Sequence, residues 1–250
     1  MEQKILFEDA QLLVLYKPAG VPVQSARVGA KDCESMLKNY LYKKAPEKGE
    51  PYLGLVHRLD QPVEGLLVFA KTPAAAADLS RQATDGRMHK YYLAIRKSVD
   101  KSVGNVEKWA KLCGKPTENV DKKVEKWIEV VDFLKKNGRE NRSEIVSAKA
   151  PEAKKAVLRY QVLKAEEGLQ LVEIQLLTGR HHQIRVEMAG QGTPLLGDRK
   201  YGDARSDVDN VDNAFPALCA YHLEFIHPKT KKKMEFEKLP ENPAFAKFLT

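Results

Sequence analysis

Residues 54–72 read GLVHRLDQPVEGLLVFAKT, and the second half of this stretch sets our fold prediction. Its uninterrupted apolar run, LLVFA, predicts a strand that is buried on both faces. Thr72 and Pro73 then supply an N-cap and a first-turn proline. We therefore expect a helix that runs to about Thr84 and ends at Gly86.

The rest of the chain predicts mostly short strands. We expect one strand at residues 12–16 and a helix from an Asp32 cap to about Lys44. A shorter helix is expected from Gly179 to Gly190. Further strands are expected at residues 91–95, 156–163, 169–177, 218–226 and 233–237. Because strands outnumber long helices, the predicted fold class is α+β, with a mainly antiparallel mixed sheet flanked by helices and loops.

Composition limits the class of protein. The 250 residues carry 42 Lys+Arg and 34 Asp+Glu, a net charge of +8, which favours a polyanionic partner only weakly. Apolar residues make up 43%, as in a globular protein, and no apolar run is long enough to span a bilayer. Acidic residues stand where a signal peptide would be apolar, which predicts a cytoplasmic protein. The three cysteines are too widely spaced for a disulfide scaffold or a cysteine zinc site.

The first candidate cluster is His57-Arg58-Leu59-Asp60. An aspartate that follows a strand and stands beside an arginine can act as a nucleophile or a general base. The alternative is an Arg–Asp pair that only ties down a loop, and spacing alone favours that alternative.

The second cluster is TGRHHQIRV at residues 178–186. Helical spacing puts His181 and Arg185 on one face, where the guanidinium can hold a carboxylate ionised. Paired histidines raise the possibility of a metal site, but neighbouring residues of a helix point to different sides and no HExxH spacing is present. Gly179 and Arg180 can also bind a phosphate at a helix N-terminus.

Two further clusters are weaker. Tyr91 and Tyr92 face opposite sides of the expected strand, so one of them can line a nucleotide pocket and stack on a base, although ordinary strand tyrosines are the commoner case. Residues 192–202 form a Gly- and Pro-rich loop. Phosphate-loop, dinucleotide-binding and GxSxG motifs are missing, so the ATPase, dinucleotide oxidoreductase and α/β-hydrolase classes lack support.

Taken together and in order, these clusters resemble the RluA family of RNA pseudouridine synthases. The resemblance covers nearly the whole chain and includes the opening Lys17-Pro18-Ala19-Gly20 and the closing His227-Pro228. Its motifs are HRLD at 57–60 with GLLVFAK at 65–71, TGRHHQIRV at 178–186, PLLGD at 194–198 and YG at 201–202. The resemblance implies a pseudouridine synthase-like fold and the isomerisation of uridine to pseudouridine in rRNA or tRNA, without a cofactor or metal.

The resemblance also implies residue roles. Asp60 is the catalytic aspartate, which attacks C1′ or acts as the base that generates a glycal. Tyr92 stacks on the base and assists proton transfer at C5, and Arg185 pairs with the aspartate. Arg58 fills the gap left by the extruded uridine. Three more residues of these motifs are assigned to RNA binding: Lys90, Arg180 and His182.

The chain departs from the family pattern at a few positions. Residues 61–65 read QPVEG, where the family more often has Arg after Asp and Thr-Ser before Gly. The acid at Glu64 is expected to put negative charge close to the RNA path. His181-His182 replaces a common Thr-His pair. The four residues Asp60, Tyr92, Arg185 and Arg58 are intact, so activity is still predicted.

The resemblance predicts a single catalytic domain over residues 1–250. We expect no separate N-terminal RNA-binding domain, a charged and variable surface segment at residues 100–155, and a monomer that binds no membrane. Two alternatives remain. One is a catalytically silent RNA-binding module on the same fold. The other is a metal-dependent hydrolase that uses His181, His182, His57 and Asp60.

Overall fold

The computed structural model describes residues 4–25, 29, 31–98, 127–202 and 215–249. The chain forms two compact units. Unit 1 comprises Met1–Lys90 and Cys219–Glu241, and unit 2 comprises Tyr91–Leu218 and Asn242–Thr250. Among the described residues, no helix has both the length and the apolar character needed to cross a membrane.

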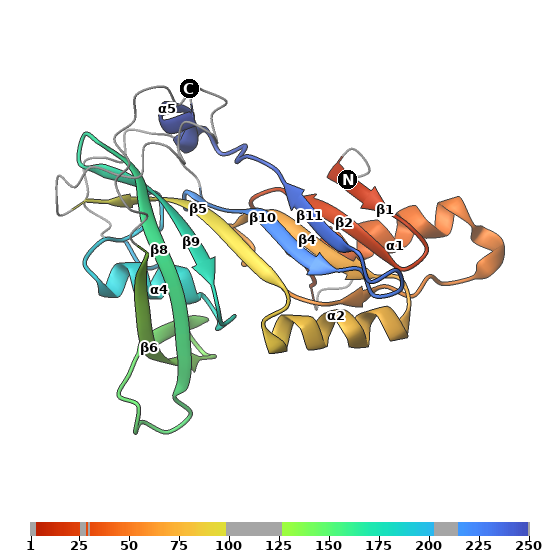
Figure 1. Cartoon of the computed structure of the whole chain (residues 1–250), viewed down its shortest axis with the longest axis horizontal. Coiled ribbons are helices and arrows are strands. Elements are labelled where there is room, and N and C mark those ends of the chain that lie inside the picture. Colours follow the sequence, from red (N-terminus) through yellow and green to blue (C-terminus); the bar gives the residue numbers. More distant parts are fainter. Residues whose placement is uncertain (1–3, 26–28, 30, 99–126, 203–214, 250) are drawn as a thin grey trace. The chain divides into compact units, whose positions relative to one another are not determined.

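Unit 1 contains six strands and two α-helices in its described part (Figure 1). They are β1 (Ile5–Glu8), β2 (Leu12–Lys17), α1 (Cys33–Lys44), the 3-10 turn η2 (Pro46–Lys48), β3 (Gly54–Leu55), β4 (Glu64–Ala70), α2 (Pro73–Asp85), β10 (Leu218–Ile226) and β11 (Lys233–Glu237). β1 pairs with β2, β2 and β3 pair with β4, and β11 pairs with β10, all antiparallel. β10 and β4 form a short parallel pair.

The centre of unit 1 is the strand predicted from residues 66–70. Every residue of β2 and β4 is buried, which confirms strands covered on both faces. Gly65 has φ +131°, and a Cβ there would collide with the backbone of Ala220. A glycine is therefore required for β4 to approach β10 at this point.

Both predicted helices of unit 1 are confirmed at their caps. The Asp32 side chain accepts a hydrogen bond from the Ser35 N–H at the start of α1. The Thr72 side chain does the same for the Ala75 N–H in α2, which ends at Gly86 in the left-handed conformation. These are the contacts that N-cap side chains and a C-terminal glycine supply.

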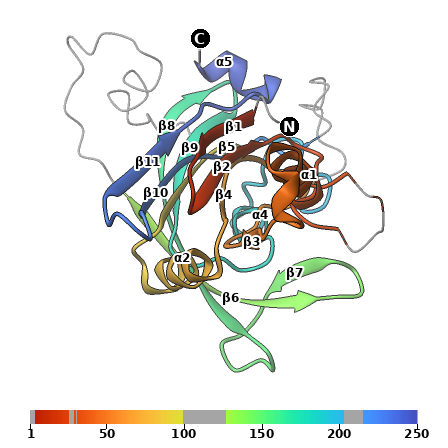
Figure 2. The ribbon, with the colours of Figure 1, turned by 90° about the vertical axis from the view of Figure 1, so that its right-hand side faces the viewer.

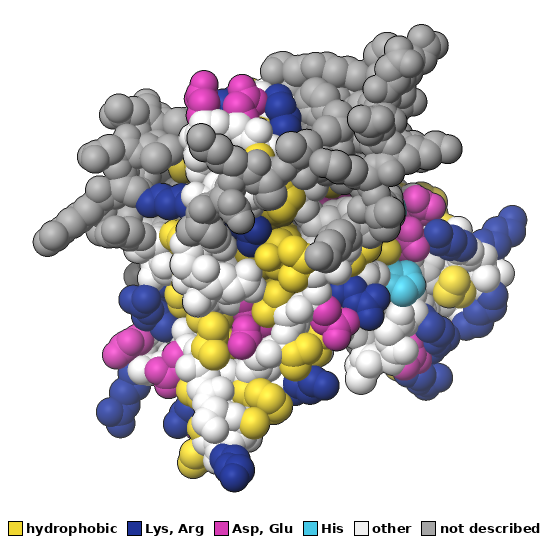
Figure 3. Space-filling view, turned by 60° about the vertical axis from the view of Figure 1, so that its left-hand side comes forward, with side chains coloured by type: hydrophobic (Ala, Val, Ile, Leu, Met, Phe, Trp, Pro, Cys, Tyr) yellow, Lys and Arg dark blue, Asp and Glu magenta, His cyan; other side chains and the backbone are white. Residues whose placement is uncertain are grey.

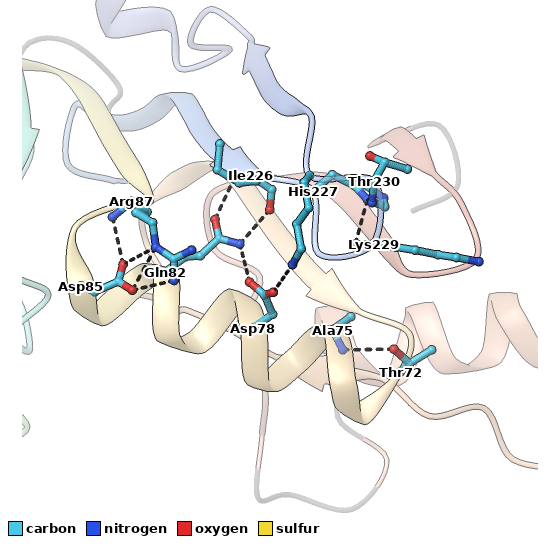
Figure 4. A network of polar contacts seen from close by, with 11 residues as sticks. Thr72, Ala75, Asp78, Gln82, Asp85, Arg87, Ile226, His227, Lys229 and Thr230 are labelled. Carbon is cyan, nitrogen blue, oxygen red and sulfur yellow. Dashed lines mark hydrogen bonds and ion pairs between the residues drawn. The ribbon is translucent and has the colours of Figure 1, made fainter.

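α2 is fastened to the end of β10 by one glutamine (Figure 4). The Gln82 amide donates to the Ile226 carbonyl at 2.7 Å and accepts from the Ile226 N–H at 2.8 Å. The same amide donates to Asp78, whose carboxylate also pairs with Lys231 at 2.7 Å. Gln82 is fully buried, so this two-way contact fixes the helix against the strand.

Unit 2 contains an antiparallel sheet in the order β5, β9, β8, β6, β7 (Figure 2). Its elements are β5 (His89–Lys97, which starts at the end of unit 1), β6 (Ile128–Asn137), β7 (Arg142–Ile145), β8 (Lys154–Glu166), β9 (Leu169–Leu176), α4 (Gln183–Gly190), the 3-10 turn η4 (Pro243–Phe245) and α5 (Ala246–Leu249). The predicted strands at 156–163 and 169–177 are confirmed as β8 and β9, which form a hairpin with Glu167 and Gly168 at positive φ in its turn. The mainly antiparallel α+β fold class is confirmed.

The charged segment contains two strands that the sequence did not predict. Residues 128–145 form the paired strands β6 and β7, most of whose side chains are at least partly exposed, and β6 adds to the sheet beside β8. Polar side chains on the exposed positions of β6 hide its alternation in the sequence. Residues 99–126 of the same segment, with Cys113, lie outside the described residues.

Candidate active site

In unit 1, Asp60 lies in the loop between β3 and β4. Its backbone carbonyl accepts a hydrogen bond from the Val63 N–H at 3.0 Å, which closes a tight turn. The next residue, Gln61, exchanges two hydrogen bonds with Gly20, one from the Gly20 N–H at 2.9 Å and one to the Gly20 carbonyl at 3.0 Å. The loop is thus held by backbone groups and by the Gln61 side chain, and Arg58 on the same loop is exposed.

A buried lysine, Lys17, joins the Asp60 loop to the loop that contains Gly20. The Lys17 ammonium donates to the carbonyls of Pro18 at 2.9 Å, Val21 at 2.8 Å and Gln61 at 3.0 Å. The side chain is fully buried, and burial lowers the pKa of Lys17 to about 8, although the nearby Asp60 carboxylate acts in the opposite direction. All three ammonium protons are therefore used to fix the backbone beside Asp60.

Glu64 lies inside unit 1, and not at its surface. The side chain is 4% exposed, and with Cys219 it raises the pKa of the Tyr16 hydroxyl, an effect for which burial is the main cause. Glu64 also acts on Lys17, whose charge it favours. This departure from the family pattern is therefore a change within the core, and an effect of the Glu64 charge on nearby RNA stays a prediction.

In unit 2, Arg185 of α4 forms a bidentate ion pair with Asp198. Its Nε and Nη2 donate to the two carboxylate oxygens at 2.8 and 2.7 Å, and both side chains are buried. Asp198 also accepts the N–H groups of Lys200 and Tyr201. Burial alone would raise the pKa of Asp198, but Arg185 and these two N–H groups lower it. The carboxylate is therefore ionised and holds the guanidinium in a fixed plane.

His182 packs beside this pair. Its Nδ1 lies 2.8 Å from the Tyr201 hydroxyl, and the Arg185 guanidinium lies 5.2 Å from the centre of the Tyr201 ring. Burial, with the charges of Arg185, His181 and Lys200, lowers the pKa of His182 to about 3. The imidazole is thus neutral at physiological pH.

The expected start of the helix at Gly179 is wrong. α4 begins at Gln183, and His182 is its N-cap with φ +54°. Because the two histidines precede the helix, their rings stack at 3.7 Å instead of pointing to different sides. For the same reason, His181 does not share a helical face with Arg185. The His181 ring instead contacts Ser143 of β7 through Nδ1 at 2.9 Å.

α4 also carries a buried acid. Glu187 is fully buried, and within the described part of the chain its carboxylate has no well-formed hydrogen bond, although the Gln183 amide lies close to it. Burial raises the pKa of Glu187 to about 8; the Gln183 amide acts against this increase, and the Asp132 carboxylate of β6 adds to it. The side chain is thus mostly protonated at neutral pH.

Glu187→Gln is expected to stabilise the protein in a pH-dependent way. Because the folded-state pKa of Glu187 is raised, the folded protein binds the Glu187 proton more tightly than the unfolded chain does. The wild type therefore loses stability as pH rises from about 4.5 to about 8, whereas the variant, which has no such proton, does not. The free energy of unfolding of the variant should exceed that of the wild type by an amount that grows to a few kcal/mol across this window and is constant above it. Urea unfolding at several pH values measures this, with exposed Glu140→Gln as the control. A difference independent of pH would contradict the prediction.

The sequence matches a known protein family over most of its length. The family described as RNA pseudouridylate synthase matches residues 11–190, which include Asp60, Tyr92 and Arg185. The chain belongs to the RNA pseudouridylate synthase family.

Curated family members are similar over almost all of the chain. The ribosomal large subunit pseudouridine synthase D of Nitrosomonas europaea is 34% identical over 96% of this chain and 63% of that protein. The Zymomonas mobilis protein of the same name is 32% identical over 96% of this chain and 70% of that protein. The chain therefore spans about two thirds of the length of these two relatives.

Solved structures of the family share the fold. Human RNA Pseudouridylate Synthase Domain Containing 4 superposes with a TM-score of 0.71 at 23% identity, over 99% of this chain and 92% of that one. Human RNA Pseudouridylate Synthase Domain Containing 1 gives a TM-score of 0.66 at 21% identity, over 95% of this chain and 83% of that one. The predicted pseudouridine synthase-like fold is confirmed.

The residues assigned from the family pattern divide between the units. Asp60, Arg58 and Lys90 belong to unit 1. In unit 2, Arg185 and His182 are brought together, and Tyr92 lies on β5 opposite Ile174, with only 5% of its surface exposed. Arg180 is exposed, and its Nε donates to the Lys155 carbonyl at 2.8 Å, so its stem is fixed to β8.

Three residues with structural roles at these sites were missed by the sequence reasoning. Asp198 and Tyr201 lie in a stretch that reads only as a structured loop, although both belong to the motifs of the resemblance. Lys17 ends an apolar run, and a lysine in that position was a signal for a buried, multiply bonded ammonium.

Proposed function

We propose that this chain isomerises uridine in RNA to pseudouridine. The observation that carries the proposal is that Asp60, Tyr92 and Arg185 are all intact within the region that matches the family. The backbone contacts of the Asp60 loop and the Arg185–Asp198 pair support it, because catalytic groups need fixed positions.

The proposed reaction balances without a cofactor. The C1′–N1 bond breaks and a C1′–C5 bond forms, while the proton at C5 leaves and N1 of uracil regains a proton. Asp60 either attacks C1′ or removes the proton that generates a glycal. Tyr92 stacks on the extruded base and assists proton transfer at C5, and Arg58 occupies the vacated stack.

Arg185 is proposed to pair with the Asp60 carboxylate and keep it ionised. The Asp198 pair fixes the guanidinium through Nε and Nη2. A guanidinium that is already fixed by one carboxylate loses little freedom when it binds a second acceptor. Asp198 is therefore a positioning residue in this proposal.

The proposed substrate is large-subunit rRNA, because relatives named ribosomal large subunit pseudouridine synthase D match 96% of the chain. The Lys and Arg side chains on the face drawn in Figure 3 are spread among acidic and apolar ones. Such a distribution suits many weak contacts to the RNA backbone, assisted by Arg180, His182 and Lys90. We further propose that the chain acts as one catalytic domain and as a cytoplasmic monomer, in line with a ribosomal RNA substrate.

Tritium release tests the proposal directly. Unmodified large-subunit rRNA carrying tritium at uracil C5 is incubated with the purified chain, and tRNA labelled in the same way is incubated in parallel. We expect release from rRNA that is unchanged by EDTA. Release only from tRNA would overturn the substrate assignment. RNA binding without release would identify a silent RNA-binding module, and loss of activity in EDTA would favour metal-dependent chemistry.

A further inference from the structure

One face of the hairpin formed by β10 and β11 in unit 1 carries a histidine and two glutamates (Figure 1). His222 and Glu224 are two residues apart on β10, so their side chains share a face, and Glu235 of β11 pairs directly with Glu224. The opposite face of β10 is apolar, because Leu223 and Phe225 are buried in the core. The three polar side chains therefore form a cluster on the outer face of the hairpin, and no step of the proposed reaction uses it.

The three side chains bring their donor atoms close together. The His222 Nε2 lies 3.3 Å from Glu224 Oε1 and 3.3 Å from Glu235 Oε1, and all three atoms lie within 4.8 Å of one another. Imidazole nitrogen and carboxylate oxygen are both zinc ligands, and ligand atoms about 2.0–2.1 Å from a tetrahedral Zn²⁺ lie roughly 3.3 Å apart. The two distances from His222 thus match two edges of such a tetrahedron.

The charges of the cluster also favour a cation. Glu224 and Glu235 lie directly opposite each other across the hairpin, where two like charges destabilise a pair of strands. The Lys233 ammonium approaches the second oxygen of each carboxylate, at 3.1 Å from Glu224 Oε2 and 3.5 Å from Glu235 Oε2. One ammonium balances one of the two carboxylates, which leaves the oxygens that face His222 for a further cation.

We propose that His222 Nε2, Glu224 Oε1 and Glu235 Oε1 bind a divalent transition-metal ion, and that Zn²⁺ is the ion that this ligand set fits best. Three ligands come from the described residues, so water completes the tetrahedron. β11 has β10 as its described pairing, at an edge of the sheet. An ion bound by both strands therefore holds this edge strand in unit 1. The site does not depend on the proposed function.

Zn²⁺ binding to the purified full chain tests the site without RNA. The chain is stripped of metal with EDTA, exchanged into buffer without EDTA, and titrated with zinc chloride by calorimetry. We expect one Zn²⁺ at this site, and a rise in melting temperature of roughly 5 °C when free Zn²⁺ is about 100 times its Kd. Titration with Co²⁺ should give the strong visible absorption of tetrahedral coordination.

Two ligand variants and one control locate the ion. His222→Gln and Glu235→Gln should each weaken Zn²⁺ binding at least about tenfold and remove the rise in melting temperature at the same Zn²⁺ concentration. The Glu235 side chain is half exposed, so Glu235→Gln keeps the test valid if His222→Gln does not fold. Glu237→Gln is the matched control, because Glu237 lies opposite His222 on β11 but outside the cluster. It should change the affinity less than threefold.

A lysine variant should have the opposite effect. Lys233→Gln removes a positive charge that repels the metal ion, so it should strengthen Zn²⁺ binding about three- to tenfold. If the cluster were only a network of ion pairs, this variant would lose an ion pair and gain no affinity for Zn²⁺.

Three outcomes would overturn the site. They are a wild-type Kd for Zn²⁺ weaker than about 1 mM, an unchanged affinity in both His222→Gln and Glu235→Gln, or no gain in affinity in Lys233→Gln. Tritium release is not among these measurements. A failed metal site and a failed proposed function are therefore distinguishable.

Discussion

Asp60→Asn should reduce tritium release from uracil C5 by at least about a thousandfold, the loss expected when a nucleophile or base is removed. The amide has nearly the same size as the carboxylate but cannot attack C1′ or accept a proton. The loop should keep its position, because Lys17 and Gly20 hold it through Gln61. The loss should therefore be in kcat, with RNA affinity and melting temperature close to those of the wild type.

The matched control for this substitution is Asp85→Asn. Asp85 is an exposed aspartate of unit 1 that pairs with Arg87, and exposed pairs of this kind contribute little to stability. Its activity should equal that of the wild type. Tritium release by Asp60→Asn within tenfold of the wild type would refute the catalytic role of Asp60.

Asp198→Asn should destabilise the protein by about 3–5 kcal/mol, because it leaves the buried Arg185 guanidinium without its bidentate partner. This corresponds to a fall in melting temperature of roughly 10 °C. Because the guanidinium is no longer fixed, kcat should fall at temperatures where the variant is still folded. Thermal unfolding and tritium release on the same samples measure the two effects.

A double substitution separates stability from activity in this pair. Arg185→Met combined with Asp198→Leu removes both charges, and replacing a buried ion pair with apolar side chains is often neutral or stabilising. Stability should therefore return while activity stays low. A single Asp198→Asn variant that is as stable and active as the wild type would contradict the account of Asp198 as the residue that positions Arg185.

Local signals made much of the fold predictable. The apolar run of β4, the Thr72 and Asp32 caps and the Gly86 terminus are short-range features, and each is found where the sequence indicates it. The strands β10 and β11 were also predicted, with their bounds. The family motifs predicted Asp60, Tyr92 and Arg185 as a set.

The misses depend on contacts between distant residues. The predicted start of α4 was wrong because His182 has a left-handed backbone conformation, which ends the regular helix before it. His182 also contacts Tyr201, and no local sequence rule predicts that contact. Glu64 reads as a surface acid, and only the pairing of β4 with β10 encloses it. β6 was missed because its register with β8, rather than an apolar pattern, fixes it in the sheet.

Pseudouridine mapping of total RNA from a strain that lacks the gene tests the central claim most directly. The account predicts that one or a few uridines of large-subunit rRNA lose their modification, and that the wild-type gene restores them while Asp60→Asn does not. An unchanged pseudouridine map, or full restoration by Asp60→Asn, would contradict it.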